Sequence, residues 1–323
     1  MVFRPARARA PEPARAAAIL APVNFAQLLF PDFSLILIGY LVCRFTALDR
    51  TVWEQAEVLV YYFLFPVLLF HSITRSPLDL GEASSLIGAG VTLGVSGIAM
   101  AYALPFVPWL GRHIDRREHA GAAQIAFRFN SFIALALAER LAGARGQLLI
   151  AVLIGFCVPL FNLGAVWPMA RHSRTGVVRA LVRNPLILAT FSGLVVNLLG
   201  LRVPQWLVPT LTRIGGASLA VGLLAAGAGM QFGKMTQSPA LTAGVLSIKH
   251  LLMPLVAFAL ARLWRLDAAQ TAVLLAFSAT PTASSAYVLA ARMGYDGPYV
   301  AGLVTLSTIL GLASLPFALG MLG

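Results

Sequence analysis

The stretch AFSATPTASSA, residues 276–286, places a proline among small and hydroxyl side chains in the middle of an apolar segment. That segment, Ala268 to Ala291, is long enough to cross a membrane. Because Pro281 has no N–H and its ring clashes with the preceding turn, we expect the helix to break there. Backbone groups freed at membrane depth are tolerated only inside protein or facing water. Interrupted membrane helices are where transporters commonly bind their substrates.

The composition of the whole chain indicates an integral membrane protein. Hydrophobic residues make up 59% of the 323 residues, charged residues make up 11%, and the mean hydropathy is +0.83. Soluble domains carry about 25% charged residues. The net charge of +12 comes from basic residues between apolar stretches, which membrane topology explains better than a nucleic-acid surface does. We therefore expect the lipid bilayer, and no nucleic acid, as a partner.

Ten apolar stretches have roughly the 20 residues that a membrane span needs. In chain order they are Asn24–Phe45, Glu54–Ile73, Ala83–Leu110, Ala120–Ala142, Gln147–Met169, Arg183–Leu201, Ile214–Phe232, Ala240–Trp264, Ala268–Ala291 and Pro298–Leu322. Residues 1–22 are expected to form a disordered or interfacial tail, and residues 23–323 a single ten-span domain.

The loops between the spans predict the orientation. Loops after odd-numbered spans carry more Lys and Arg than those after even-numbered spans, which places the odd loops in the cytoplasm and both termini outside. The arginines at 171, 174, 179 and 183 decide this prediction, while those at 4, 7, 9 and 15 in the tail offset it.

The two halves of the chain, 24–169 and 183–322, resemble one another. GYLVCRFTALDRTVW (39–53) leads into span 2 as GLVVNLLGLRVPQW (193–206) leads into span 7. Because each half has an odd number of spans, the second copy enters the membrane from the opposite face. The sequence predicts an all-α fold of two inverted five-helix repeats, an arrangement that supports alternating access.

Spans 4 and 9 also correspond to one another. With Arg140 set on Arg292, Asn130 stands opposite Thr282, next to Pro281. The two polar interruptions are therefore expected at equivalent depths in the repeats.

Five segments together are similar in order and spacing to the auxin efflux carrier family. They are YYFLFPVLLFHSI (61–73), RNPLILATFSGLVVNLLGLRVP (183–204), SLAVGLLAAGAGMQF (218–232), KHLLMPL (249–255) and ATPTASSAYVLAARMG (279–294). Bacterial members are often described as malate or other organic-acid permeases, and plant relatives are the PIN-FORMED carriers. The resemblance implies a bacterial inner-membrane transporter of a small organic anion.

The resemblance also implies how the spans divide. Spans 4 and 9 would be unwound and would cross in a mobile core with spans 3, 5, 8 and 10, next to a scaffold of spans 1, 2, 6 and 7. Span 4 departs from the plant pattern, because Phe129 stands before Asn130 where the plant carriers have a proline. Span 9 matches well at Thr280, Pro281 and Thr282.

The broken helices suggest how an anion would bind. The second half of span 9 would begin near Thr282 to Ser284 with unpaired N–H groups at the positive end of its dipole. The second half of span 4, after Asn130, would point at the same region from the other side. Hydrogen bonds from Asn130, Thr280, Thr282, Ser284 and Ser285 would hold a carboxylate without trapping it.

Other polar residues in the spans allow two interpretations each. Arg128 and Lys249 either favour anionic cargo or cap backbone carbonyls freed by the break. His250 either carries a coupling proton or is a structural hydrogen-bonding group. Asn162 and Asn197 either line the pathway or, more simply, bond neighbouring helices. Gly222, Gly227 and Gly229 allow close approach of another helix, in the scaffold or in a homodimer.

Scarcity of acidic residues in the spans predicts sodium-independent transport with no metal and no cofactor. The first alternative is a sodium- or proton-coupled symporter of the bile-acid-symporter type. The second alternative, an intramembrane enzyme, is weaker, since the spans hold no paired His and carboxylate and no nucleophile motif. The third alternative is a membrane sensor that moves no solute. Substrate identity and transport direction do not follow from the sequence.

Overall fold

The computed structural model describes residues 25–75, 80–169, 185–232 and 237–322. All regular secondary structure in these residues is helical. The predicted tail and all four arginines that decide the predicted orientation lie outside the described residues.

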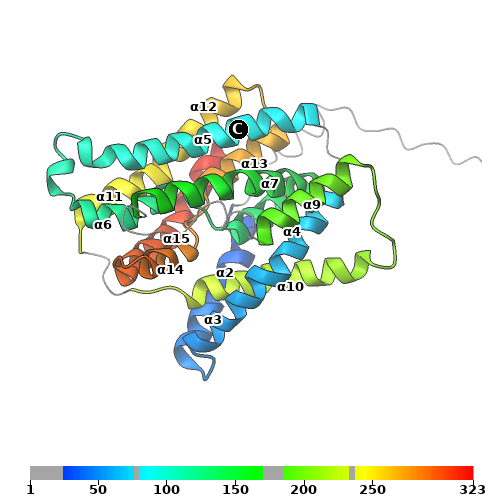
Figure 1. Cartoon of the computed structure of the whole chain (residues 1–323), viewed down its shortest axis with the longest axis horizontal. Coiled ribbons are helices and arrows are strands. Elements are labelled where there is room, and N and C mark those ends of the chain that lie inside the picture. The colour runs from blue at the N-terminus through cyan, green and yellow to red at the C-terminus, as the bar shows by residue number, and fades with distance from the viewer. Residues whose placement is uncertain (1–24, 76–79, 170–184, 233–236, 323) are drawn as a thin grey trace, which may run out of the picture.

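The described helices are arranged as Figure 1 shows. In order they are α2 (Phe25–Phe45), α3 (Arg50–Leu59), η1 (Val60–Leu64), α4 (Phe65–Thr74), α5 (Leu80–Ala103), η2 (Leu104–Phe106), η3 (Gly111–His113), α6 (Arg116–Ala122), η4 (Ala123–Ala126), α7 (Ser131–Met169), α9 (Pro185–Leu198), α10 (Val208–Ala228), α11 (Pro239–Ser247), η6 (Ile248–Leu252), α12 (Met253–Leu263), α13 (Ala268–Ala279), α14 (Ser285–Arg292) and α15 (Gly297–Gly320). α7 is kinked at Ala142 and Gly143, where the backbone leaves the helical region.

Six helical segments among the described residues are long and apolar enough to cross a membrane. They are Arg50–Thr74, Ala83–Phe106, Arg116–Met169, Val208–Ala228, Pro239–Leu263 and Gly297–Gly320. Two shorter apolar helices are Leu188–Leu198 and Ala268–Ala279. The longest of the six, Arg116–Met169, contains both the interruption before α7 and the kink within it.

Packing divides the helices into two groups. In the first helix group, α2 packs against α10 and α4 packs against α9 and α10. In the second helix group, α7 packs against α5 and α13, and α15 against α13 and α14. In Figure 1 the blue α2 and α3 and the yellow-green α10 lie below α5 and α7 of the second group, with α14 beside them.

Glycines allow the closest packing within the first helix group. A Cβ on Gly39 would lie 1.9 Å from the Leu224 carbonyl oxygen, and one on Gly227 would lie 1.8 Å from the Ile36 carbonyl oxygen. The backbones of α2 and α10 therefore touch, as small residues permit in membrane helix pairs. Gly222 instead lies against the Phe132 ring of α7. Contacts inside one chain thus account for Gly222 and Gly227.

The two largest differences between predicted and observed boundaries are both explained by proline. α10 begins at Val208, six residues before the predicted Ile214, because Pro209 occupies one of its first two positions, where a missing N–H costs nothing. α5 ends at Ala103 and a 3-10 turn at Phe106, so the helix stops short of the predicted Leu110. Pro105 lies in that turn and cannot continue the α-helical bonding.

Two π-helical turns each come just before a proline. η1 leads into α4, which has Pro66 in its first turn, and η6 leads into α12, which has Pro254 there. A π turn accommodates the missing N–H and the ring by widening the helix, and such turns are frequent at functional sites. η6 holds Lys249 and His250, the two basic residues of this span that the sequence singled out.

Candidate functional site

The helix that carries the proline-containing stretch is interrupted. α13 ends at Ala279, Thr280 is extended, and α14 begins at Ser285. A second interruption separates η4, which ends at Ala126, from α7, which begins at Ser131.

The two interruptions meet, and one backbone–backbone and one side-chain–backbone hydrogen bond join them. The Asn130 N–H donates to the Pro281 carbonyl oxygen at 2.6 Å. The Thr282 hydroxyl donates to the Ile125 carbonyl oxygen at 2.8 Å. The Asn130 N–H and the carbonyl groups of Pro281 and Ile125 are therefore paired across the crossing, which lowers the cost of breaking two buried helices.

Asn130 caps the helix that follows it. Its side-chain oxygen accepts from the N–H groups of Phe132, at 3.0 Å, and Ile133, at 3.3 Å. An asparagine at this position satisfies N–H groups that the first helical turn leaves unpaired. Its amide nitrogen meets no acceptor within the described residues, although the residue is only 6% exposed. Asn130 thus keeps donors available beside the crossing.

Thr282 begins a chain of polar contacts that runs into α15. Its N–H donates to Ser307 Oγ at 3.0 Å, and His250 Nε2 lies 2.9 Å from the same oxygen. His250 Nδ1 lies 2.8 Å from Ser314 Oγ, which donates to the Ala279 carbonyl oxygen at 3.1 Å. Both ring nitrogens are thus engaged in holding the crossing against α15. Ser307 is fully buried, which makes it a poor candidate for a nucleophile.

Thr280 and Lys249 both donate hydrogen bonds to carbonyl groups at the end of α13. The Thr280 hydroxyl donates to the Phe277 carbonyl oxygen at 2.9 Å, so it caps its own helix. The Lys249 ammonium group donates to the Ser278 carbonyl oxygen at 3.1 Å, and the residue is 1% exposed. In this conformation neither side chain is open to a ligand.

Arg128, in the interruption between η4 and α7, lies beside the start of α14. Its guanidinium group donates to Gln124 Oε1 at 3.1 Å and to Ser285 Oγ at 3.0 Å. Among the described residues no side-chain or backbone acceptor meets the N–H groups of Ala283 and Ser284, and Ser284 makes no side-chain cap. The positive end of α14 and a guanidinium group are therefore side by side, with Ser285 exposed. Such an arrangement attracts an anion.

Asn162, the remaining sequence candidate, lies apart from this cluster. It is half-buried in α7, and no hydrogen bond joins it to the residues of the crossing that the structure describes. Asn197 bonds a neighbouring helix, because its amide donates to the Ile73 carbonyl oxygen at 2.5 Å at the end of α4. Of its two interpretations, helix packing is the one that this contact supports.

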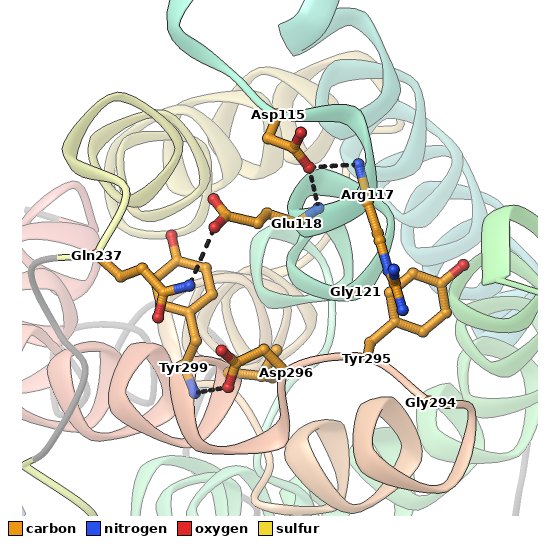
Figure 2. A pocket seen from close by; sticks show the side chains of 10 residues that line it. Asp115, Arg117, Glu118, Gly121, Gln237, Gly294, Tyr295, Asp296 and Tyr299 are labelled. Atoms are coloured by element: carbon orange, nitrogen blue, oxygen red, sulfur yellow. Dashed lines mark hydrogen bonds between the residues drawn. The ribbon is translucent and has the colours of Figure 1, made fainter.

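A cavity of about 330 Å³ opens elsewhere, between the starts of α6 and α15 (Figure 2). Asp115 and Asp296 there cap α6 and α15 by accepting from Glu118 N–H and Tyr299 N–H. Gln237 donates to Glu118. Three carboxylates face one arginine in this lining, which disfavours an anionic ligand. We therefore place the candidate site at the crossing.

Sequence reasoning missed Gln124, Ser307 and Ser314 as parts of the crossing. Gln124 donates to the Ala286 carbonyl oxygen at 3.1 Å and accepts from Arg128. Ser307 and Ser314 are seven residues apart and share one face of α15. In the sequence, this spacing of two small polar residues in an apolar span was the signal that could have indicated a polar face of α15.

One ion pair and one hydrogen bond connect the helix groups. Arg140 of α7 donates to Asp32 of α2 at 2.8 Å. Arg50 of α3 pairs with Glu57 at 3.0 Å and also donates to the Tyr287 hydroxyl of α14. The Arg140–Asp32 pair and the Arg50–Tyr287 hydrogen bond each join α2 or α3 to the second half of an interrupted helix, while Glu57 pairs with Arg50 inside α3.

Comparison with known proteins decides the family. Residues 112–319, well over half of the chain, match the family described as "Membrane transport protein". The chain belongs to this family. The resemblance to the auxin efflux carriers is thereby confirmed, and this membrane transport protein is an integral membrane transporter and not an enzyme.

Relatives of this membrane transport protein cover most of its length. A protein of Rhizobium meliloti (strain 1021) named "Putative malonate transporter" is 25% identical over 304 residues, which is 89% of this chain and 92% of that protein. "Uncharacterized transporter YfdV" of Escherichia coli (strain K12) is 23% identical over 279 residues, or 82% and 87% of the two chains.

Proposed function

We propose that this protein is a secondary transporter of a small carboxylate, malonate or a close analogue, that works by alternating access. The observation that supports the proposal is the start of α14, where the N–H groups of Ala283 and Ser284 face no acceptor and Arg128 bonds Ser285. A negative charge is favoured at that end of a helix dipole. The name of the Rhizobium meliloti relative points to the same class of substrate.

Binding would combine donors from both interrupted helices. The Asn130 amide nitrogen, the N–H groups near Ser284 and the Arg128 guanidinium group would hold the carboxylate. Thr280, Pro281 and Thr282 would shape the break instead of touching the anion, because their polar groups already bond protein atoms. Release remains easy, since a single guanidinium group is the only fixed charge among these donors.

The two helix groups would then move relative to each other. In this proposal α2, α3–α4, α9 and α10 form the scaffold, and the interrupted helices with α5, α11–α12 and α15 form the mobile core of two inverted five-span repeats. The packing of α2 on α10 and of α13 on α7 supports this division. The setting would be a bacterial inner membrane with both termini outside.

Counterflow in proteoliposomes tests the function. The purified protein, loaded with unlabelled malonate, should accumulate radiolabelled malonate from outside. Arg128→Gln removes the charge beside the start of α14, and we expect the rate to fall at least about tenfold, as loss of a hydrogen bond from a charged group predicts.

Arg117→Gln is the matched control. It removes one exposed arginine at the start of α6, beside the cavity and away from the crossing, so its rate should equal that of the wild type. An Arg128→Gln variant as active as this control would refute the site, and a wild-type protein that exchanges no carboxylate would refute the function.

A further inference from the structure

The last turn of α13 ends inside the protein, and each of its four carbonyl groups accepts a hydrogen bond. The pairs are Ala276 with Thr280 N–H, Phe277 with Thr280 Oγ1, Ser278 with Lys249 Nζ, and Ala279 with Ser314 Oγ. One of these four donors carries a formal charge. The negative end of the α13 dipole is thus compensated by a lysine from a different helix.

The ammonium group occupies a position that normally requires a counter-ion. Lys249 is 1% exposed, and no carboxylate of the described residues forms an ion pair with it. A buried charge is costly unless it is paired or coordinated, and charges inside membrane spans are retained mainly for function. The carbonyl end of α13 is what this charge faces.

The π turn η6 places the Lys249 ammonium group at the carbonyl end of α13. Lys249 and His250 are consecutive in the π turn η6, and both reach the crossing, Lys249 at Ser278 and His250 at Ser307 and Ser314. Neighbouring residues of a regular α-helix point about 100° apart. The widened turn before Pro254 lets both contribute to one site.

In ion-coupled transporters, the carbonyl ends of broken helices are where Na⁺ or H⁺ binds, while the N–H ends face the anionic substrate. The interrupted helix here presents both ends on either side of Pro281, with the carbonyl end at Ser278 and the N–H end at Ser284. We propose that the Lys249 ammonium group is a built-in cation that takes the place of a coupling ion at the end of α13. The proposal rests on the transport function proposed above and predicts a cycle that needs no sodium.

Thermal unfolding tests the cation site without relying on transport. Lys249→Ala removes the ammonium group and leaves space for a small amine. In detergent the variant should unfold at a lower temperature than the wild type, and propylammonium chloride should raise that temperature by binding only the folded state. Tetramethylammonium chloride, which has no N–H donor, should not. The same additions should leave the wild type and Arg117→Ala unchanged.

If propylammonium and tetramethylammonium chloride changed the unfolding temperature of Lys249→Ala equally, the proposal would be overturned. Should that variant fail to fold, Lys249→Arg and Lys249→Met replace it, the first keeping the charge and the second the approximate length of the side chain. We expect Lys249→Arg to unfold at a higher temperature and to transport faster than Lys249→Met. A methionine variant equal to or better than the arginine variant would also overturn the proposal.

Malonate counterflow in sodium or choline buffer adds the functional readout. The wild type should give equal rates in both. Lys249→Ala should be at least about tenfold slower in choline, and either sodium or propylammonium should restore part of its rate. A wild type that requires sodium overturns the proposal for Lys249. A wild type that moves no carboxylate overturns the transport function instead, and the unfolding comparison then decides the cation site.

Discussion

Asn130 has two hydrogen-bonding ends, and they can be separated by substitution. Its oxygen caps α7, while its amide nitrogen is open beside the crossing. Asn130→Asp keeps a capping oxygen, so stability should change little, but it replaces the donors by a negative charge that repels a carboxylate. We expect malonate counterflow to fall at least about tenfold while the unfolding temperature stays near that of the wild type.

Asn130→Ala is the companion variant. It removes the cap as well, and should lower the free energy of unfolding by about 1 kcal/mol in addition to slowing transport. If Asn130→Asp transported at the wild-type rate, the amide nitrogen would have no part in binding, and the residue would be a helix cap alone.

Sequence alone could predict the crossing but not the contacts around it. Pro281 predicts a helix break from its own covalent structure, and Asn130 marks the partner break by internal repetition. The contacts of Thr282 with Ser307 and of Lys249 with Ser278 depend on how α15 and η6 pack against the break. The spacing of Ser307 and Ser314 could mark a polar face of α15, but no local pattern encodes which residues meet across the helices, so both contacts required the structure.

At the scale of elements, the break between α13 and α14 is held against α15 by close packing. A Cβ on Gly311 would lie 2.5 Å from Pro281 Cγ and 3.1 Å from Cδ, so no other residue fits without movement. Gly311→Ala should therefore displace the crossing, lower the free energy of unfolding by about 1–3 kcal/mol and slow malonate counterflow.

Gly216→Ala supplies the control for Gly311→Ala. Gly216 is also helical, in α10, but a Cβ there meets no atom within 4 Å. This variant should be neutral or more stable by up to about 1 kcal/mol, because alanine favours a helix over glycine. If both variants unfolded at the same temperature, the close contact between α15 and Pro281 would not contribute to stability.

Element boundaries show the same limit of sequence reasoning. The apolar composition predicted where helices lie, because lipid demands it, and α12 and α15 ended within two residues of their predictions. The start of α10 was wrong because TLTR, residues 210–213, is too polar to be counted in a span, although it continues the helix that Pro209 begins. Hydropathy measures the part of a helix in lipid and not its full length.

At the scale of the whole molecule, the two helix groups are joined by charged contacts that a rearrangement would have to break. The Asp32 side chain of α2 is 3% exposed and pairs with Arg140 of α7, whose side chain is 31% exposed. The hydrogen bond from Arg50, which is paired with Glu57 of its own helix, to the Tyr287 hydroxyl joins the groups at the other interrupted helix. Both contacts therefore belong to one conformation of the transport cycle in this proposal.

A double-mutant cycle measures how strongly the first of these contacts holds the groups together. Arg140→Leu leaves the buried Asp32 carboxylate without its cation and should cost about 3–5 kcal/mol of unfolding free energy. Asp32→Asn should cost less, because a neutral amide is cheaper to bury than a carboxylate. In the double variant the effects should be smaller than additive, since the second substitution removes the charge that the first left unpaired. Chemical denaturation of the four proteins in detergent gives the comparison, and strictly additive losses would show that Asp32 and Arg140 do not couple the two helix groups.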